Sequence, residues 1–157
     1  VVADKTGSLI ATSARFGALL SGASAQTVEA LTKFGEKIGV AFQVADDLLD
    51  VTSDETASGK TPGTDLREGV PTLVTLYVIA ANNPADKDLI AKLNGPISEN
   101  DLAGVINQLR SHKALTDVKD YLAKVATEAN DLLVDLPEGS AKEALKSLTF
   151  ALVNRSS

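Results

Sequence analysis

Hydrophobic positions recur every three or four residues along most of the chain, which is the spacing of helices with one buried face. In the first segment, which ends near Gly22, this spacing joins Leu9, Phe16 and Leu20 in a sequence rich in Ala, Ser and Gly. Small residues let a helix pack closely against its neighbours. We therefore expect this first helix to be central in the fold.

The second segment, from about residue 26 to 51, carries one continuous apolar stripe. Its positions are Val28, Leu31, Phe34, Ile38, Phe42, Ala45 and Leu49. Gly35 and Gly39 lie inside this segment, although glycine lowers the stability of a helix interior. We therefore expect a neighbouring element to approach the backbone closely at these two glycines.

The pattern breaks over residues 52–69, which are rich in Gly, Ser and Thr and have no apolar periodicity. A long stretch without secondary structure is uncommon inside a compact domain and is often functional. The sequence therefore predicts a functional loop between two helices.

Apolar spacing returns after this loop and predicts helices over about 71–81, 86–93, 98–109, 115–132 and 140–152. Val, Thr and Ile make 70–81 the best candidate for a strand, but its three- and four-residue spacing favours a helix. No hairpin signal or fixed-period repeat is present. The expected fold is all-α, with residues 1–157 in a single domain.

The most distinctive polar pattern is at the end of the second helix, where residues 43–50 read QVADDLLD. Gln43, Asp46 or Asp47, and Asp50 are three or four residues apart and so share one helix face. Carboxylates four apart repel each other, and a helix C-terminus disfavours negative charge. A cation should compensate, and oxygen-only ligands indicate Mg²⁺ or Ca²⁺ rather than zinc.

The simplest alternative is a solvated acidic helix end, because Asp-Asp-x-x-Asp is a short pattern. Two features favour a site: apolar residues flank the aspartates, and the following loop carries Gly59-Lys60. An EF-hand starting at Asp50 is excluded because its sixth position is Glu55 instead of glycine. A Walker loop ending at Lys60 is excluded because Asp54 stands where its first glycine is required.

Composition removes several other classes of function. The chain has no Cys and a single His, which excludes disulfides, thiolate catalysis and Cys-built zinc sites. The net charge of −6 is unfavourable for nucleic-acid binding, which depends on Lys and Arg. No apolar run is long enough to span a membrane and no secretory signal opens the chain, so we expect a cytoplasmic protein. The absence of Met, even at position 1, leads us to expect a piece of a longer protein.

Several short motifs occur in a specific order. They are Lys5-Thr6-Gly7, Gly17-Ala18, Gly22, the acidic segment 43–50, Gly59-Lys60 and Gly63-Thr64-Asp65-Leu66. This order resembles the C-terminal half of trans-isoprenyl diphosphate synthases, and in particular the chain-elongating polyprenyl enzymes. The resemblance covers about residues 3–80 with specific motifs and the later helices in general character.

The resemblance implies the all-α isoprenoid synthase fold and a prenyltransferase that condenses an allylic diphosphate with isopentenyl diphosphate. It implies that Asp46, Asp47 and Asp50 form the second of two aspartate-rich motifs that hold Mg²⁺ on the allylic diphosphate. Asp46 is the expected direct ligand. Family members are usually homodimers, and we expect the same of the full-length parent.

The resemblance also assigns roles to four other residues. Lys5 and Lys60 are similar to lysines that bind the substrate diphosphate, and Thr6 and Gln43 to positions that line the reacting end of the allylic chain. All four are therefore candidate catalytic residues. Arg155 is similar to a basic residue near the isopentenyl site.

The chain departs from the family pattern because the first aspartate-rich motif and the isopentenyl-binding region are absent, and Val70 stands where many relatives carry lysine. We therefore expect this chain alone to be inactive. Alternatives are a non-catalytic subunit of the same fold and a helical interaction module with solvated aspartates. Terpene cyclisation is a further enzymatic alternative, but the motifs Lys5-Thr6 and Gly59-Lys60 belong to the elongating branch.

Overall fold

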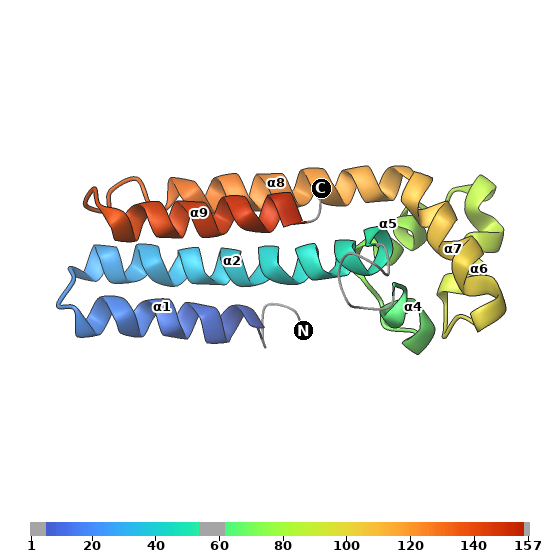
Figure 1. The fold of residues 1–157 in the computed structure, drawn as a ribbon, viewed down its shortest axis with the longest axis horizontal. Helices are drawn as coiled ribbons and strands as arrows, with labels where there is room; N and C mark the ends of the chain where they lie inside the picture. Colours follow the sequence, from blue (N-terminus) through green and yellow to red (C-terminus); the bar gives the residue numbers. More distant parts are fainter. Residues whose placement is uncertain (1–5, 54–61, 156–157) are drawn as a thin grey trace. The chain divides into compact units, whose positions relative to one another are not determined.

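The structure, a computed structural model, describes residues 6–53 and 62–155, which contain helices and no strand (Figure 1). The helices are α1 Ser8–Leu20, α2 Ala25–Thr52, α4 Thr64–Glu68, α5 Leu73–Ala81, the short 3₁₀ helix η2 Pro84–Asp86, α6 Lys87–Leu93, α7 Glu99–Ser111, α8 Lys113–Asp131 and α9 Ser140–Arg155. The predicted all-α class is confirmed.

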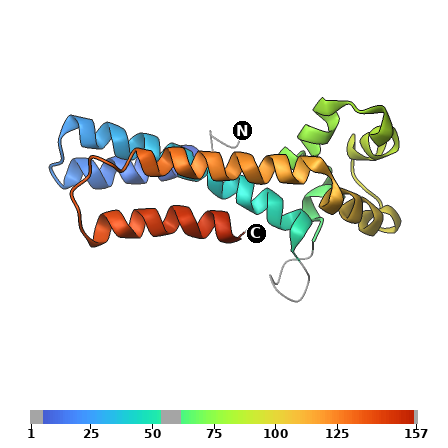
Figure 2. The same cartoon turned by 90° about the horizontal axis from the view of Figure 1, so that it is seen from above.

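These helices are divided between two compact units. Unit 1 contains the chain up to Ala45 and from Tyr121 to Arg155, and unit 2 contains Asp46–Asp120. Because their boundaries fall inside α2 and α8, both helices contribute to each unit. Within unit 1, α1, α9 and the corresponding parts of α2 and α8 run alongside one another (Figures 1 and 2).

In unit 1, α1 and α2 pack with almost no space between their backbones. A Cβ added to Gly35 would lie 2.6 Å from Cα of Ala11, and one added to Gly39 would lie 2.3 Å from Cα of Gly7. Both distances are far below van der Waals contact, so no side chain larger than hydrogen fits there. The predicted close approach at the two glycines of α2 is confirmed.

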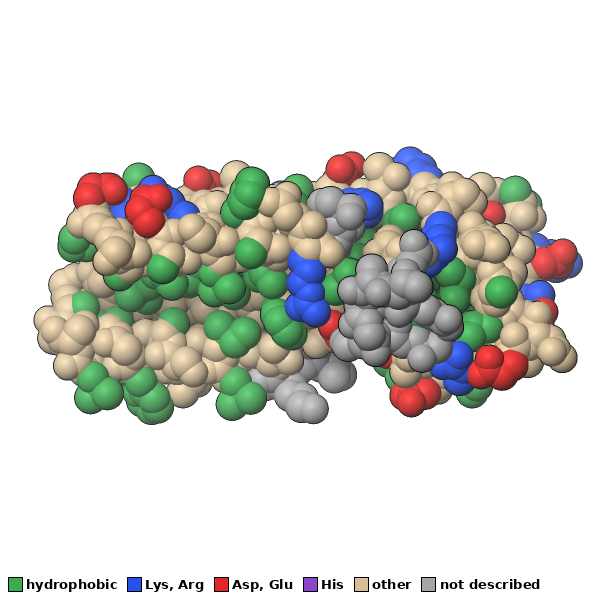
Figure 3. All heavy atoms as spheres, viewed as in Figure 1, with side chains coloured by type: hydrophobic (Ala, Val, Ile, Leu, Met, Phe, Trp, Pro, Cys, Tyr) green, Lys and Arg blue, Asp and Glu red, His purple; other side chains and the backbone are tan. Residues whose placement is uncertain are grey.

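The sequence predicts that helix α1 is central in the fold. This prediction is wrong for its large apolar side chains, which are exposed in the described part of the chain. Leu9, Phe16 and Leu20 are 66%, 56% and 88% exposed, whereas the small Ala11 and Ala18 are buried. At 100° per residue the two sets lie on opposite faces of the helix. The small face makes the contact with α2, and Figure 3 shows hydrophobic side chains along the outer edge of α1.

The buried face of α2 also differs from the predicted stripe near its middle. Phe42 is 39% exposed, while Ala41, Val44 and Leu48 are buried. At 100° per residue, Ala41, Val44 and Leu48 share one face of the helix, and Phe42 lies at least about 100° away from each of them. The apolar flanks of the acidic segment are nevertheless buried at Val44 and Leu48, as predicted.

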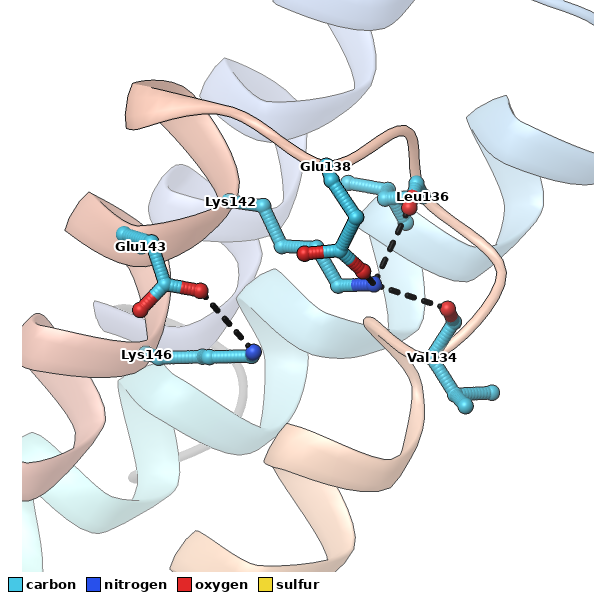
Figure 4. A network of polar contacts seen from close by, with 6 residues as sticks. All are labelled: Val134, Leu136, Glu138, Lys142, Glu143 and Lys146. Carbon is cyan, nitrogen blue, oxygen red and sulfur yellow. Dashed lines mark hydrogen bonds and ion pairs between the residues drawn. The ribbon is translucent and has the colours of Figure 1, made fainter.

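The connection between α8 and α9 is organised by one buried lysine (Figure 4). The Lys142 ammonium donates hydrogen bonds to the carbonyls of Val134 and Leu136, at 2.8 and 3.0 Å, and to the Glu138 carboxylate, at 2.7 Å. Three acceptors match the three donors of an ammonium group, so this charge is buried with its bonds made. Lys142 thereby holds the loop against the first turn of α9.

In unit 2 the predicted loop over 52–69 is partly helical, because α4 covers Thr64–Glu68. Gly63 precedes α4 in the left-handed conformation with φ 77°, and Leu66 is buried at 3% exposure. The loop prediction relied on local periodicity, which a single five-residue turn of helix does not display. Residues 54–61 of that loop are outside the described residues.

The ambiguous segment after α4 forms helix α5 and not a strand. Thr72 caps its first turn, with its hydroxyl accepting from the backbone N–H of Thr75 and the Thr75 hydroxyl accepting from the N–H of Thr72. Asn82 ends the helix in the left-handed conformation. These caps, rather than the β-branched composition, determine the local structure.

Candidate active site

The three aspartates of the acidic motif occupy the last two turns of α2, at the start of unit 2. Asp46 and Asp50 are partly exposed, whereas Asp47 is 9% exposed. The structure therefore brings the motif together on one helix, as the spacing predicts, but in three different environments.

Asp50 is held by the start of α4. Its Oδ1 accepts from the backbone N–H of Thr64 at 2.9 Å, and its Oδ2 accepts from that of Asp65 at 3.2 Å. Burial raises the pKa of Asp50, these two bonds oppose the shift, and the charges of Asp46 and Asp47 add to it. The surroundings of Asp50 thus disfavour its charged form, while the two hydrogen bonds hold its carboxylate in a fixed orientation.

Asp47 lies at the start of a different helix. Its Oδ2 accepts from the backbone N–H of Leu73, the first residue of α5, at 3.0 Å. A carboxylate at this position satisfies an otherwise unpaired donor and interacts favourably with the helix dipole. Asp47 therefore contributes to joining α2 to α5, in addition to its place in the acidic motif.

A fourth carboxylate, Asp65, joins the motif in space. Burial, followed by the charges of Asp50, Asp47, Asp46 and Glu68, raises the pKa of Asp65 to about 6. The sequence placed Asp65 in a family motif but gave it no site role, because it is 15 positions from Asp50 along the chain. Only the fold of α4 back onto the end of α2 reveals the association.

The donor set fits a hard divalent cation. The cluster offers only carboxylate oxygens. Burial, with a further contribution from mutual repulsion, raises the pKa of Asp50 and Asp65, and a bound cation would relieve both effects. Among the described residues, no three or more Asp, Glu or His converge closely enough to hold a metal by themselves. Mg²⁺ is typically bound by one or two carboxylates with waters and substrate phosphate, so an incomplete protein site suits it.

The other predicted site residues are in unit 1 or beyond the described chain. Gln43 lies on α2 one turn after Gly39, and the backbone of Thr6 packs beside that same glycine. Unit 1 thus brings Thr6 and Gln43 to one region of α2. Lys5 and Lys60 lie outside the described residues.

Arg155, which the family resemblance connects with the isopentenyl site, also has a defined position in unit 1. Its guanidinium carbon lies 5.8 Å from the centroid of the Phe42 ring, the residue before Gln43. This is the geometry of a cation–π contact. The end of α9 is therefore connected to the middle of α2.

Comparison with known proteins decides the family. Residues 1–127 match the Polyprenyl synthetase family. The chain belongs to this family. It is 41% identical over 156 residues to nonaprenyl diphosphate synthase of Mycobacterium tuberculosis, an alignment that covers 99% of this chain and 47% of that protein. It is 35% identical to heptaprenyl diphosphate synthase component 2 of Bacillus subtilis, covering 92% of this chain and 41% of that one.

Solved structures that resemble this chain are also prenyl diphosphate synthases, like the relatives found by sequence. A geranylgeranyl pyrophosphate synthase from Corynebacterium glutamicum, complexed with calcium and isoprenyl diphosphate, matches with a TM-score of 0.90 and 36% identity. The match covers 99% of this chain and 48% of that one. The chain thus spans about half the length of the relatives it matches and corresponds to their C-terminal half. Within the described part of the chain, no helix combines the length and apolarity needed to cross a membrane.

Proposed function

We propose that this chain forms the C-terminal half of a polyprenyl diphosphate synthase, which condenses an allylic diphosphate with isopentenyl diphosphate. The observation that carries the proposal is the carboxylate cluster of Asp46, Asp47, Asp50 and Asp65, in a chain that belongs to the polyprenyl synthetase family. In the proposed reaction the allylic carbon–oxygen bond breaks and diphosphate leaves. The double bond of isopentenyl diphosphate then attacks the allylic carbon, and loss of a proton forms the new double bond.

The residues of this chain would act mainly on the leaving group. Asp46, Asp47 and Asp50 would hold Mg²⁺, with Asp46 the direct ligand and Asp65 beside them. Lys5 and Lys60 would bind the diphosphate as point charges. Bound Mg²⁺ supplies Lewis-acid stabilisation of the departing diphosphate. Thr6 and Gln43, which share one region of unit 1, would line the reacting end of the allylic chain, where positive charge develops.

Three further expectations belong to the same proposal. The chain alone is inactive, because its described carboxylates do not complete a metal site and a second acidic motif is needed. Residues 1–157 act as one catalytic domain, which is supported by the continuity of α2 and α8 through both units. The full-length enzyme is a cytoplasmic homodimer, as the family resemblance implies.

The test is a chimera that joins the first half of the Mycobacterium tuberculosis relative to this chain. A radiolabelled condensation assay with Mg²⁺ should give product from the chimera and none from the 157-residue chain. Robust turnover by the chain alone would contradict the need for a second acidic motif. A folded chimera without turnover, beside an active intact relative, would contradict the prenyltransferase assignment.

A further inference from the structure

The C-terminal end of α2 concentrates negative charge that no basic residue of its own last turn neutralises. The last carbonyls of a helix lack intrahelical partners and carry partial negative charge. In α2 this end also holds Asp46, Asp47 and Asp50, and the last turn contains no basic residue. The cation and the hydrogen-bond donors must therefore come from elsewhere in the chain.

Arg110, near the end of α7, supplies both within unit 2. Its Nε donates to the carbonyl of Val51 at 2.8 Å, and its Nη2 donates to the carbonyl of Ser53 at 2.7 Å. The two donors are on one edge of the planar guanidinium, so a single side chain fixes two carbonyls and their spacing. A residue 57 positions away thereby caps the helix that carries the acidic motif.

The face of α7 that carries Arg110 also packs against Gly63, the residue that precedes α4. Leu102, Ile106 and Arg110 are four residues apart and form one stripe. A Cβ on Gly63 would lie 2.8 Å from Ile106 Cδ1 and 2.9 Å from Leu102 Cδ1, so α7 packs tightly on this glycine. The N–H of Gly63 donates to the carbonyl of Asp50 at 2.8 Å. The stripe on α7 therefore contacts both the end of α2, through Arg110, and Gly63 before α4, through Leu102 and Ile106.

We infer that Arg110 is a positioning residue for the acidic cluster: by holding the carbonyls of Val51 and Ser53, it fixes the orientation of Asp50. Since the Asp50 carboxylate binds the first N–H groups of α4, it also determines where Asp65 lies. The inference rests on the proposed function only for its catalytic consequence. The structural part is that Arg110 fixes the positions of Asp50 and Asp65 relative to each other, and this part does not depend on the proposed function.

The structural part is tested by amide hydrogen exchange on the 157-residue chain. In the Arg110→Ala variant, the amides of Gly63, Thr64 and Asp65 should exchange at least about tenfold faster, because the bonds they donate to Asp50 loosen. The amides of 34–44 in unit 1 should be unchanged. Arg110→Lys keeps the charge but cannot donate to both carbonyls in the same plane. The exchange rates of these three amides in Arg110→Lys should therefore lie between those of wild type and Arg110→Ala. Equal exchange in wild type and Arg110→Ala would overturn the inference.

The catalytic part is tested in the chimera by the Mg²⁺ dependence of turnover. Residues that orient metal-binding groups typically contribute about 10- to 100-fold to metal affinity or activity. Arg110→Ala should therefore raise the half-saturating Mg²⁺ concentration about tenfold or more, with partial rescue in Arg110→Lys. Arg15→Ala, which removes an exposed arginine of α1, is the matched control and should have no effect.

The two tests separate the possible failures. A lower kcat with an unchanged Mg²⁺ requirement would mean that Arg110 only stabilises the fold, and would overturn its positioning role. A wild-type chimera without turnover would instead count against the proposed function. In that case the exchange measurement still decides whether Arg110 orders the acidic cluster.

Discussion

The two ends of α2 are stabilised in opposite ways. In unit 1, the helix is fixed by close backbone packing, with Gly35 against Ala11 of α1 and Gly39 against Gly7, the residue before α1. In unit 2, its end is fixed by polar contacts, in which aspartates accept from the first N–H groups of α4 and α5 and Arg110 donates to the last carbonyls. One helix thus combines a rigid packed segment with a charged terminus that other segments must organise.

This difference has a functional meaning. Close packing tolerates no added atoms but needs no charge, so it suits a scaffold. At the polar terminus, burial and then the charges of neighbouring carboxylates raise the pKa of Asp50 and Asp65, and such unfavourable charge is typical of a site completed by a ligand. If this comparison holds, substitutions at the packed end change stability only, whereas substitutions at the polar end change catalysis and, where a carboxylate accepts a backbone bond or is buried, stability as well.

The largest expected effect is on chemistry at the polar end. In the chimera, Asp46→Ala should lower kcat by about 10²–10³-fold, because an interaction that stabilises developing charge contributes ~3–4 kcal/mol to the transition state. Asp117→Ala, which removes an aspartate paired with Lys113 on α8, is the control and should change kcat little. Steady-state kinetics measure both, and equal losses would eliminate Asp46 as a ligand.

The next effect is on stability at the packed end. Gly39→Ala should lower the free energy of unfolding of the chain by about 1–3 kcal/mol, since its Cβ would lie 2.3 Å from the Cα of Gly7 and would force the backbone apart. Gly17→Ala on α1 is the matched control, because its added Cβ meets nothing within 4 Å. It should instead stabilise the chain by up to about 1 kcal/mol. Urea unfolding distinguishes them, and similar shifts would disprove the close packing.

Asp47 should behave as a structural member of the acidic motif. Asp47→Ala should cost about 1 kcal/mol of unfolding free energy, because the N–H of Leu73 loses its acceptor. Asp47→Asn retains a carbonyl acceptor and should remain within about 0.5 kcal/mol of wild type. In the chimera, Asp47→Asn should reduce kcat less than Asp46→Asn does. The reverse order would show that Asp47 is the more important metal ligand.

The smallest effect is a pH dependence of the metal-free chain. Because the pKa of Asp65 is raised from 3.8 to about 6, the folded chain binds this proton more tightly than the unfolded chain does. Asp65 therefore adds stability as the pH falls through about 6 towards 3.8, and removes it as the pH rises. Subtracting the Asp65→Asn profile from wild type should isolate this slope. A flat difference between the two profiles would mean that neither burial nor the neighbouring carboxylates raise the pKa of Asp65.

The sequence predicted most helices and the acidic motif, because both depend on local spacing. Apolar repeats located α1, α2 and the helices from α5 to α9, and the step of three or four residues placed the aspartates on one face. The two glycines of α2 correctly indicated close packing, since glycine weakens a helix interior and is tolerated there where a neighbouring backbone leaves no room for a side chain.

Tertiary contacts decided what the periodicity did not encode. The apolar spacing of Leu9, Phe16 and Leu20 is helical, yet the small opposite face of α1 packs on α2, because close backbone approach requires small residues. Helix α4 forms because its first N–H groups meet the Asp50 carboxylate. Asp65 meets Asp50, and Arg110 meets the last carbonyls of α2, through contacts between distant segments that no local pattern specifies. The sequence by itself determined the helices and the charges of this protein, and the fold decided which charges meet.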